Sequence, residues 1–269
     1  MQKHLKVLRL SYLHNDSLFQ TDKLTTNIKF SLDELSLIEV NWTNNENAMK
    51  FFKTQTNLKK VTLNLKKWYR NELDKKMWYD ELLIHLFSNN VQLNTVDLSF
   101  FKTYGCNITD LNFLNGIVNP KVENLKLFFD SSPNGTELVT VCSKLFPNVK
   151  NFNYKVANDI DHSLNQIRNW KSLESLHCDV EDINQILENV NIGGNLTNFS
   201  IRCFNADRLK KPQMIEFLNR HQNIKHLSFV IGDETTISDE ILALIANTLK
   251  SIKTLICKGT ICSLSKYSK

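Results

Sequence analysis

The segment FFKTQTNLKKVTL at residues 51–63 contains the pattern that decides the fold of this chain. Its last six residues, LKKVTL, have apolar side chains at positions 1, 4 and 6 and variable side chains between them. The whole segment aligns without gaps with FLNRHQNIKHLSF at residues 217–229. Because the six-residue pattern and the residues before it recur together, the chain is built from internal repeats.

The six-residue pattern occurs ten times along the 269 residues. The copies are LKVLRL (5–10), LDELSL (32–37), LKKVTL (58–63), LNTVDL (93–98), VENLKL (122–127), VKNFNY (149–154), LESLHC (173–178), LTNFSI (196–201), IKHLSF (224–229) and IKTLIC (252–257). Successive copies begin 27, 26, 35, 29, 27, 24, 23, 28 and 28 residues apart. Eight of the nine steps therefore lie between 23 and 29 residues, a period typical of one strand and one helix per repeat.

Each copy predicts a short strand. Successive side chains of a strand point to opposite faces, so positions 4 and 6 share one face and the variable residues share the other. The residue at position 1 packs beneath them as the chain turns in. Parallel stacking of such strands buries a continuous ladder of Leu, Val, Ile and Phe, in which each buried side chain contributes about 1.5–3 kcal/mol. No single repeat can bury its ladder alone, so only the array is stable.

The segments between the copies predict helices, because their apolar residues recur at steps of three and four. These segments are residues 45–55, 77–87, 135–146, 183–190, 215–221 and 238–250. Pro212 suits the first turn of the helix that contains 215–221. The 35-residue step predicts an extra loop around KKWYRNELDKK at 66–76. The alternation predicts an α/β horseshoe with parallel strands on its concave face and helices on its convex face.

Composition favours one domain over residues 1–269. The chain is 42% hydrophobic and 23% charged, and its seven Gly and four Pro form no linker-like stretch. The N-terminal residues alternate apolar and charged side chains, unlike a secretory signal. No segment approaches the roughly 18 consecutive apolar residues of a membrane span. We therefore expect a protein of the cytoplasm or nucleus, without a membrane partner.

The sequence contains no recognisable catalytic, metal-binding or phosphate-binding motif. The six cysteines form no CxxC pair, and the seven histidines are scattered. His177 and Cys178 are adjacent, but alternation points their side chains to opposite faces, which argues against a nucleophile pair. There is no Gly-rich phosphate loop, GxSxG or HExxH motif. We therefore predict no enzymatic activity, no catalytic residue, no metal site and no cofactor.

The strand motif and its spacing resemble the leucine-rich repeats of F-box/LRR proteins and of the ribonuclease-inhibitor class. The irregular repeat lengths and the segment FLNRHQNIKHLSF at 217–229 look more like the F-box type. This resemblance covers nearly the whole chain and implies a leucine-rich-repeat solenoid of about ten units. It also implies substrate recognition for a ubiquitin ligase, which is an argument from fold analogy. No F-box is found, and because the repeats begin at residue 5 we expect an array that lacks its N-terminal cap.

The variable positions of the strands, together with aromatic residues at or just past the strand ends, predict the binding surface, on the concave face. The residues we select are Arg9, Tyr12, Lys60, Asp97, Phe100, Lys126, Phe128, Asn153, His177, Ser200 and His226. Their mixed polar character suits a protein partner, such as a ubiquitination substrate, better than a phosphate backbone. Adaptor binding would require an F-box upstream of this chain. The alternative is a standalone ribonuclease-inhibitor-like inhibitor or scaffold.

Nucleic-acid binding is the least favoured hypothesis. The net charge is +5, with basic residues in excess over residues 1–80 and 250–269 and acidic residues in excess between them. A nucleic-acid-binding protein more often shows a continuous basic stripe. Nucleic acid would therefore have to bind at the two basic ends of the array.

Overall fold

A computed structural model gives the structure of this chain. It describes residues 5–11, 31–38, 40, 45–64, 73–101, 112–130, 135–156, 162–180, 183–189, 192, 194–203, 210–231 and 239–258. Within these residues the chain forms ten strands and six α-helices, together with two 3-10 helices. The fold is therefore α/β, as the sequence predicts, and every strand pairing described below is parallel.

The chain divides into two compact units, each built around five parallel strands. The first unit contains β1 (Val7–Ser11), β2 (Glu34–Ile38), β3 (Lys60–Asn64), β4 (Thr95–Phe101) and β5 (Asn124–Asp130). The second contains β6 (Asn151–Val156), β7 (Ser175–Val180), β8 (Asn198–Cys203), β9 (His226–Ile231) and β10 (Thr254–Lys258). In both units each strand pairs with the strand that follows it along the chain.

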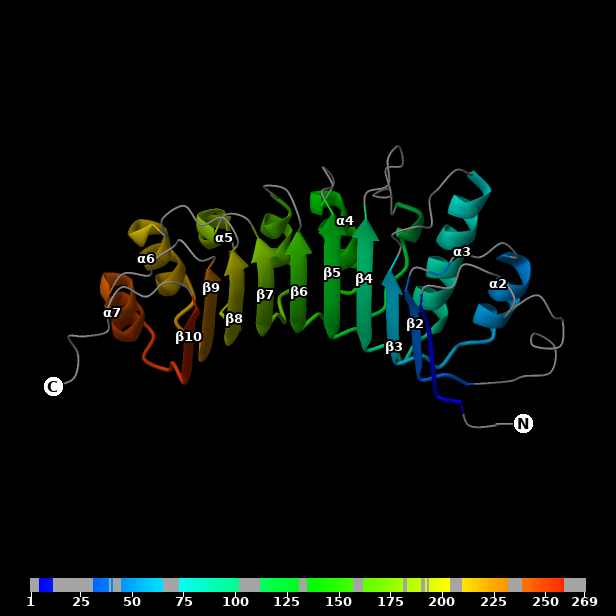
Figure 1. Cartoon of the computed structure of the whole chain (residues 1–269), viewed down its shortest axis with the longest axis horizontal. Coiled ribbons are helices and arrows are strands. Elements are labelled where there is room, and N and C mark those ends of the chain that lie inside the picture. The colour runs from blue at the N-terminus through cyan, green and yellow to red at the C-terminus, as the bar shows by residue number, and fades with distance from the viewer. Residues whose placement is uncertain are drawn as a thin grey trace. The chain divides into compact units, whose positions relative to one another are not determined.

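Helices follow most of the strands and lie on one side of the sheet within each unit (Figure 1). The α-helices are α2 (Asn45–Lys53), α3 (Leu73–Asn89), α4 (Gly135–Leu145), α5 (Ile183–Asn189), α6 (Lys211–Arg220) and α7 (Asp239–Thr248). The 3-10 helices are η2 (Asn112–Leu114) and η3 (His162–Asn169). The division between the units falls inside α4, because Ser131–Ser143 belongs to the second unit and Lys144–Asn148 to the first.

The strand prediction is confirmed in detail. All ten strands begin at position 3 of a six-residue copy, so the spacing of the strands is the spacing of the sequence pattern. Equivalent positions pair across neighbouring strands, as in Leu35 with Val61 and Leu37 with Leu63. All four of these side chains are buried, as are the position 1 residues Leu32 and Leu58. The core therefore forms from rows of equivalent residues, one row for each apolar position.

The helix predictions are confirmed for all six segments, with one correction at a boundary. Helix α3 begins at Leu73, inside the stretch 66–76 that we expected to be an extra loop. The start at Leu73 adds one turn of charged residues, Asp74 to Lys76, which carries no apolar periodicity. Pro212 lies in the first turn of α6, as predicted. Helices η2 and η3 are not predicted by the sequence, since neither has enough regularly spaced apolar residues.

Within each unit, adjacent repeats are joined by the same pair of backbone hydrogen bonds, which we call the joint. The carbonyl at position 2 of one copy accepts from the N–H groups at positions 2 and 3 of the next. For example, the Asp33 carbonyl accepts from Lys59 N–H at 2.8 Å and from Lys60 N–H at 3.1 Å. Because only backbone atoms take part, the joint forms whatever the side chain at position 2, and it sets the register of each strand.

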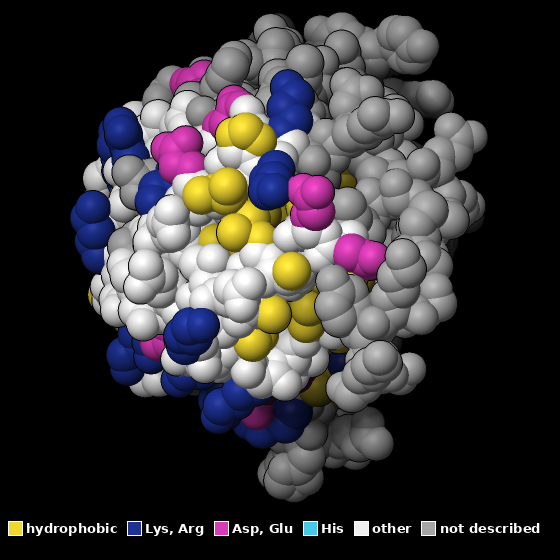
Figure 2. All heavy atoms as spheres, turned by 90° about the vertical axis from the view of Figure 1, so that its left-hand side faces the viewer, with side chains coloured by type: hydrophobic (Ala, Val, Ile, Leu, Met, Phe, Trp, Pro, Cys, Tyr) yellow, Lys and Arg dark blue, Asp and Glu magenta, His cyan; other side chains and the backbone are white. Residues whose placement is uncertain are grey.

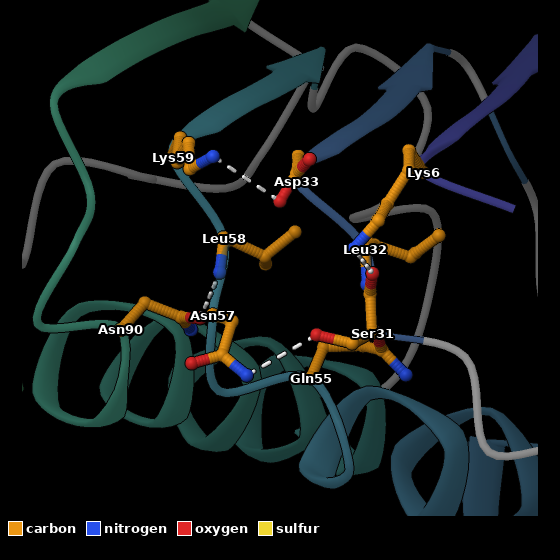
Figure 3. A network of polar contacts seen from close by, with 9 residues as sticks. All are labelled: Lys6, Ser31, Leu32, Asp33, Gln55, Asn57, Leu58, Lys59 and Asn90. Carbon is orange, nitrogen blue, oxygen red and sulfur yellow. Dashed lines mark hydrogen bonds and ion pairs between the residues drawn. The ribbon is translucent and has the colours of Figure 1, made fainter. Parts of the chain in front are cut away.

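Buried amide side chains complete the joint in the first unit (Figure 3). They lie three residues before position 1 and reach back to the preceding repeat. Gln55 Oε1 accepts from Leu32 N–H at 3.1 Å, and Asn90 Oδ1 accepts from Leu58 N–H at 2.8 Å. Asn90 Nδ2 also donates to the Leu86 carbonyl at 3.0 Å, near the end of α3. Both amides are fully buried, so these contacts satisfy backbone groups that water cannot reach.

A second series of amides lies immediately before position 1 and closer to solvent. Asn57 Nδ2 donates to Ser31 Oγ at 3.1 Å, as Figure 3 shows. Asn148, Asn195 and Asn223 each donate to a backbone carbonyl of the preceding repeat, at 3.0, 3.1 and 2.6 Å. The same short connection between helix and strand is therefore fastened to its neighbour in both units.

Strand β10 is the last strand of the second unit, and apolar side chains are exposed beside it. Leu255 is 39% exposed and Ile256 is 42% exposed, although Leu255 continues a row that is buried in β9. Figure 2 views this end and shows a hydrophobic patch with Lys, Arg, Asp and Glu side chains around it. Among the described helices, none is both long enough and apolar enough to cross a bilayer.

Candidate functional site

One face of each sheet is left uncovered by helices, and we call it the open face. It consists of the side chains at positions 3 and 5 of each copy and at position 7, the residue that follows the copy. Every one of these side chains is half-buried or exposed in both units, with the single exception of Asp179. The buried rows at positions 4 and 6 hold the backbone beneath them, so the open face has a fixed geometry.

In the first unit, the structure places five of the predicted site residues on the open face. They are Arg9, Lys60, Asp97, Lys126 and Phe128, on β1, β3, β4, β5 and β5 respectively. Asp97 and Lys126 are register partners, and Lys126 Nζ lies 3.1 Å from Asp97 Oδ2. Phe128 is half-buried at position 7. The structure thus brings Asp97 and Lys126 together and places Lys60 in a different row, at position 3.

In the second unit, four predicted residues lie on the open face. Asn153, His177 and Ser200 are consecutive register partners at position 5. His226 is at position 3 of β9, where its Nδ1 lies 3.1 Å from Thr254 Oγ1. The prediction therefore identifies one continuous row and one separate residue in this unit. Of the other two predicted residues, Tyr12 lies outside the described part of the chain, as does the side chain of Phe100.

The charges on the open face of the first unit are arranged in pairs. Arg9 Nη2 on β1 lies 3.4 Å from Glu34 Oε2 on β2. The second pair is formed by Asp97 on β4 and Lys126 on β5. All four side chains are partly exposed, and such pairs contribute about 0–1 kcal/mol to stability. Their effect on this face is to alternate positive and negative charge along the sheet.

A shallow depression of about 570 Å³ opens at the start of β2, β3 and β4. It is lined by Asp33, Glu34, Lys59, Lys60, Gln92, Asn94 and Thr95. Lys59 Nζ lies 3.5 Å from Asp33 Oδ1 in this lining, above the buried amide contacts of the joint (Figure 3). Small-molecule pockets are mostly enclosed and apolar, so this open polar depression fits the border of a larger contact surface better.

The second unit holds a charged cluster that the sequence analysis missed. At its centre is Asp179, which lies at position 7 of β7 and is only 4% exposed. Its Oδ1 lies 3.0 Å from His177 Nε2, and its Oδ2 lies 3.6 Å from Lys155 Nζ and 3.8 Å from Arg202 Nη1. Lys155, Asp179 and Arg202 are register partners on β6, β7 and β8. The sequence did contain a signal for this cluster. Position 7, the residue that follows each six-residue copy, is charged in three successive repeats, and these three charges form one row.

Two buried cysteines, Cys142 and Cys178, are not suited to nucleophilic chemistry. Burial raises the pKa of the Cys142 thiol to about 12. Burial, with a smaller contribution from the Asp179 charge, also raises the pKa of Cys178 well above its usual range. Both side chains are therefore neutral thiols near pH 7, and the thiolate is the reactive form. Within the same residues, no group of three or more His, Cys, Asp or Glu side chains is arranged to hold a metal ion.

The structure thus shows two largely polar faces, one per unit, with paired charges on the first and a central buried carboxylate on the second. Comparison with known proteins adds no identification to this description. The sequence matches no protein-family model, and no curated protein is significantly similar to it.

Proposed function

We propose that this chain is a protein-binding module of the leucine-rich-repeat type, which binds its partner through the open faces of the two units. The observation that carries the proposal is the contrast between the two sides of each strand. In strands β2 to β9 the side chains at positions 4 and 6 are buried in register, whereas those at positions 3 and 5 are polar and half-buried or exposed. Such a surface is preorganised, so little side-chain and backbone freedom is lost when a partner binds.

The composition of the open faces favours a protein partner over a nucleic acid. Interfaces between proteins combine hydrogen-bonding groups with a few charges and aromatic residues. Binding of a phosphate backbone instead requires several cations along a continuous track. On the first unit, Glu34 and Asp97 interrupt the cations and pair with Arg9 and Lys126. These carboxylates would repel a phosphate chain that followed the sheet.

The resemblance to F-box/LRR proteins extends the proposal to substrate recognition for a ubiquitin ligase, with adaptor binding performed by an F-box outside these repeats. A ribonuclease-inhibitor-like inhibitor is the alternative, and it would use the same open faces. The two hypotheses differ in the kind of partner that they require. A ligase substrate would accumulate in cells when this protein is depleted, whereas an inhibited enzyme would become more active at unchanged abundance.

The test compares two triple variants in affinity purification followed by quantitative mass spectrometry. The first replaces Lys126, Asn153 and His177 with Ala on the open faces. The matched control replaces Lys144, Glu216 and Asn219 with Ala, which are exposed residues of helices α4 and α6. We expect partners held by the natural chain to be retained by the control and reduced about tenfold or more by the open-face variant.

Direct titration of each candidate partner with the purified chain then excludes indirect capture. Partners that remain bound to the open-face variant at unchanged affinity would refute the proposed surface. Equal losses in both variants would do the same, because they would indicate a general change in stability rather than a lost contact.

A further inference from the structure

The row formed by Lys155, Asp179 and Arg202 differs from the other charged groups of the open faces. A carboxylate that is withdrawn from water is costly unless cations and hydrogen bonds compensate it. Asp179 has both, because Lys155 and Arg202 flank it on the neighbouring strands and His177 contacts its other oxygen. The buried carboxylate therefore holds the two cations at fixed positions on either side of it.

Both cations remain accessible to solvent. The side chains of Lys155 and Arg202 are 41% and 46% exposed. The nearest guanidinium nitrogen of Arg202 is 3.8 Å from Asp179 Oδ2, which is an ion pair but is beyond hydrogen-bond distance. A guanidinium carries five N–H donors in a planar arrangement that can bind the two oxygens of a carboxylate, or of a phosphate, at the same time.

The rest of the open face of the second unit is uncharged apart from Lys258 and is polar at most positions, with Val230 and Ile256 as the apolar exceptions. Among positions 3, 5 and 7 of β6 to β10, the charged residues are the cations Lys155, Arg202 and Lys258 and the single acid Asp179. Because Asp179 is buried, the charge that this face presents to a partner is positive. The first unit differs, since its acids Glu34 and Asp97 are themselves partly exposed beside their cations.

We propose that this row binds acidic side chains of an extended protein segment, with Arg202 and Lys155 contacting Asp or Glu carboxylates and Asp179 acting as the positioning residue. The neighbouring Asn153 and Ser200 offer amide and hydroxyl groups suited to the peptide backbone of such a segment. A nucleic acid fits less well, because the row offers only two cations and has a negative charge at its centre. The inference rests on the proposed protein-binding function and names the chemistry of the partner.

The test measures binding of the full chain to fluorescein-labelled 12-residue peptides by fluorescence anisotropy. One probe alternates Glu and Ser, the second has Gln in place of every Glu, and the third is a single-stranded RNA of the same length. We expect the Glu peptide to bind at least about tenfold more tightly than the Gln peptide at low salt, with the difference shrinking as salt is added. The RNA is expected to bind more weakly than the Glu peptide.

Substitutions then locate the site. Arg202→Gln and Lys155→Met should each weaken binding of the Glu peptide about fivefold and leave binding of the Gln peptide unchanged. Lys144→Met, which removes an exposed lysine of helix α4 that lies outside the open faces, is the matched control and should change the affinity less than twofold.

Asp179→Asn separates positioning from net charge, because the two predict opposite results. If only net charge mattered, removing a carboxylate would strengthen binding of the acidic peptide. If Asp179 holds the cations in place, binding weakens although the face becomes more positive. Circular dichroism, together with the tryptophan fluorescence to which Trp170 contributes from its buried position against Phe152, reports whether this variant is folded. If Asp179→Asn is not folded, the inference is tested by Arg202→Gln, because that substitution changes an exposed side chain.

Equal affinity for the Glu and Gln peptides, an absence of binding to both, or tighter binding of the RNA would overturn the inference. So would an Arg202→Gln variant that binds the Glu peptide like the natural chain. None of these outcomes affects the test of the proposed function, which depends on partners captured through the open faces whatever their charge. The two proposals can therefore fail independently.

Discussion

Replacing Asn90 with Ala tests whether the buried amides are what fastens neighbouring repeats together. The change removes the acceptor of Leu58 N–H, 2.8 Å away, and the donor to the Leu86 carbonyl, 3.0 Å away. Leu58 is fully buried, so water cannot replace the lost acceptor. A buried donor left without a partner costs about 1–3 kcal/mol, and we expect the first unit to lose about 2 kcal/mol of stability.

Hydrogen exchange measured by mass spectrometry gives the most direct readout. At about 1.4 kcal/mol for each factor of ten, a loss of 2 kcal/mol corresponds to a roughly 30-fold decrease in protection. The decrease should appear in peptides that contain Leu58 and strand β3. Peptides from the second unit should change much less, because stability is distributed locally along such a chain.

Asn89→Ala is the matched control for this experiment. Asn89 is adjacent to Asn90, but its side chain is exposed and hydrogen-bonds to His85 within the same helix. Its removal should cost less than about 0.5 kcal/mol. If Asn90→Ala reduced protection of β3 no more than Asn89→Ala does, the buried amide would not be fastening the repeats, and its burial would require a different physical cause.

Two further predictions concern titratable groups. Burial lowers the pKa of His85, so below about pH 6.5 the unfolded chain binds more protons than the native chain, and the free energy of unfolding should fall as the solution is acidified. His85→Gln should flatten this dependence in urea unfolding measured between about pH 7 and pH 5, and an unchanged slope would contradict the assignment. Burial also raises the pKa values of Cys142 and Cys178, so iodoacetamide near pH 8 should alkylate neither thiol in the native chain and both after unfolding in urea. The half-buried Cys257, whose pKa is also raised by burial, should react before them, and mass spectrometry of the labelled peptides would show a different order if Cys178 were not a core residue.

The strands were predictable because their signal is local. Alternation needs only the next few residues, and in parallel strands with a constant joint it also fixes the register. Leu35 and Val61 therefore pair as their equivalent places in the sequence pattern indicate. The open face was predictable for the same reason, since the residues between buried positions, such as Lys126 and His177, must point the other way.

The polar joints were not predicted, although a signal for them was present. The gapless alignment of 51–63 with 217–229 places Gln55 against His221 and Asn57 against Asn223. Asn57 and Asn223 do make equivalent contacts with the preceding repeat. Gln55 and His221 are both buried, but the partner of each depends on the helix beside it, and that information is not local.

The charged row was missed for a different reason. Lys155, Asp179 and Arg202 lie at position 7, one residue beyond the apolar pattern, where nothing in a single repeat distinguishes a structural charge from a solvated one. Their significance arises from register, because three separate repeats must be aligned before the carboxylate is seen between two cations. Burial of Asp179 follows from that environment rather than from its own segment.

The backbone joint at position 2 also bears on how such a chain changes length during evolution. A duplication that inserts one whole repeat recreates the same two hydrogen bonds on both of its borders, because the Asp33 and Lys225 carbonyls are used alike. An insertion of any other length between two strands must be absorbed in a connection, as the 35-residue step before β4 illustrates. Copy number can therefore change while the joint is preserved, and side chains at position 2 can diverge freely. Relatedness between such chains is better traced repeat by repeat than from end to end.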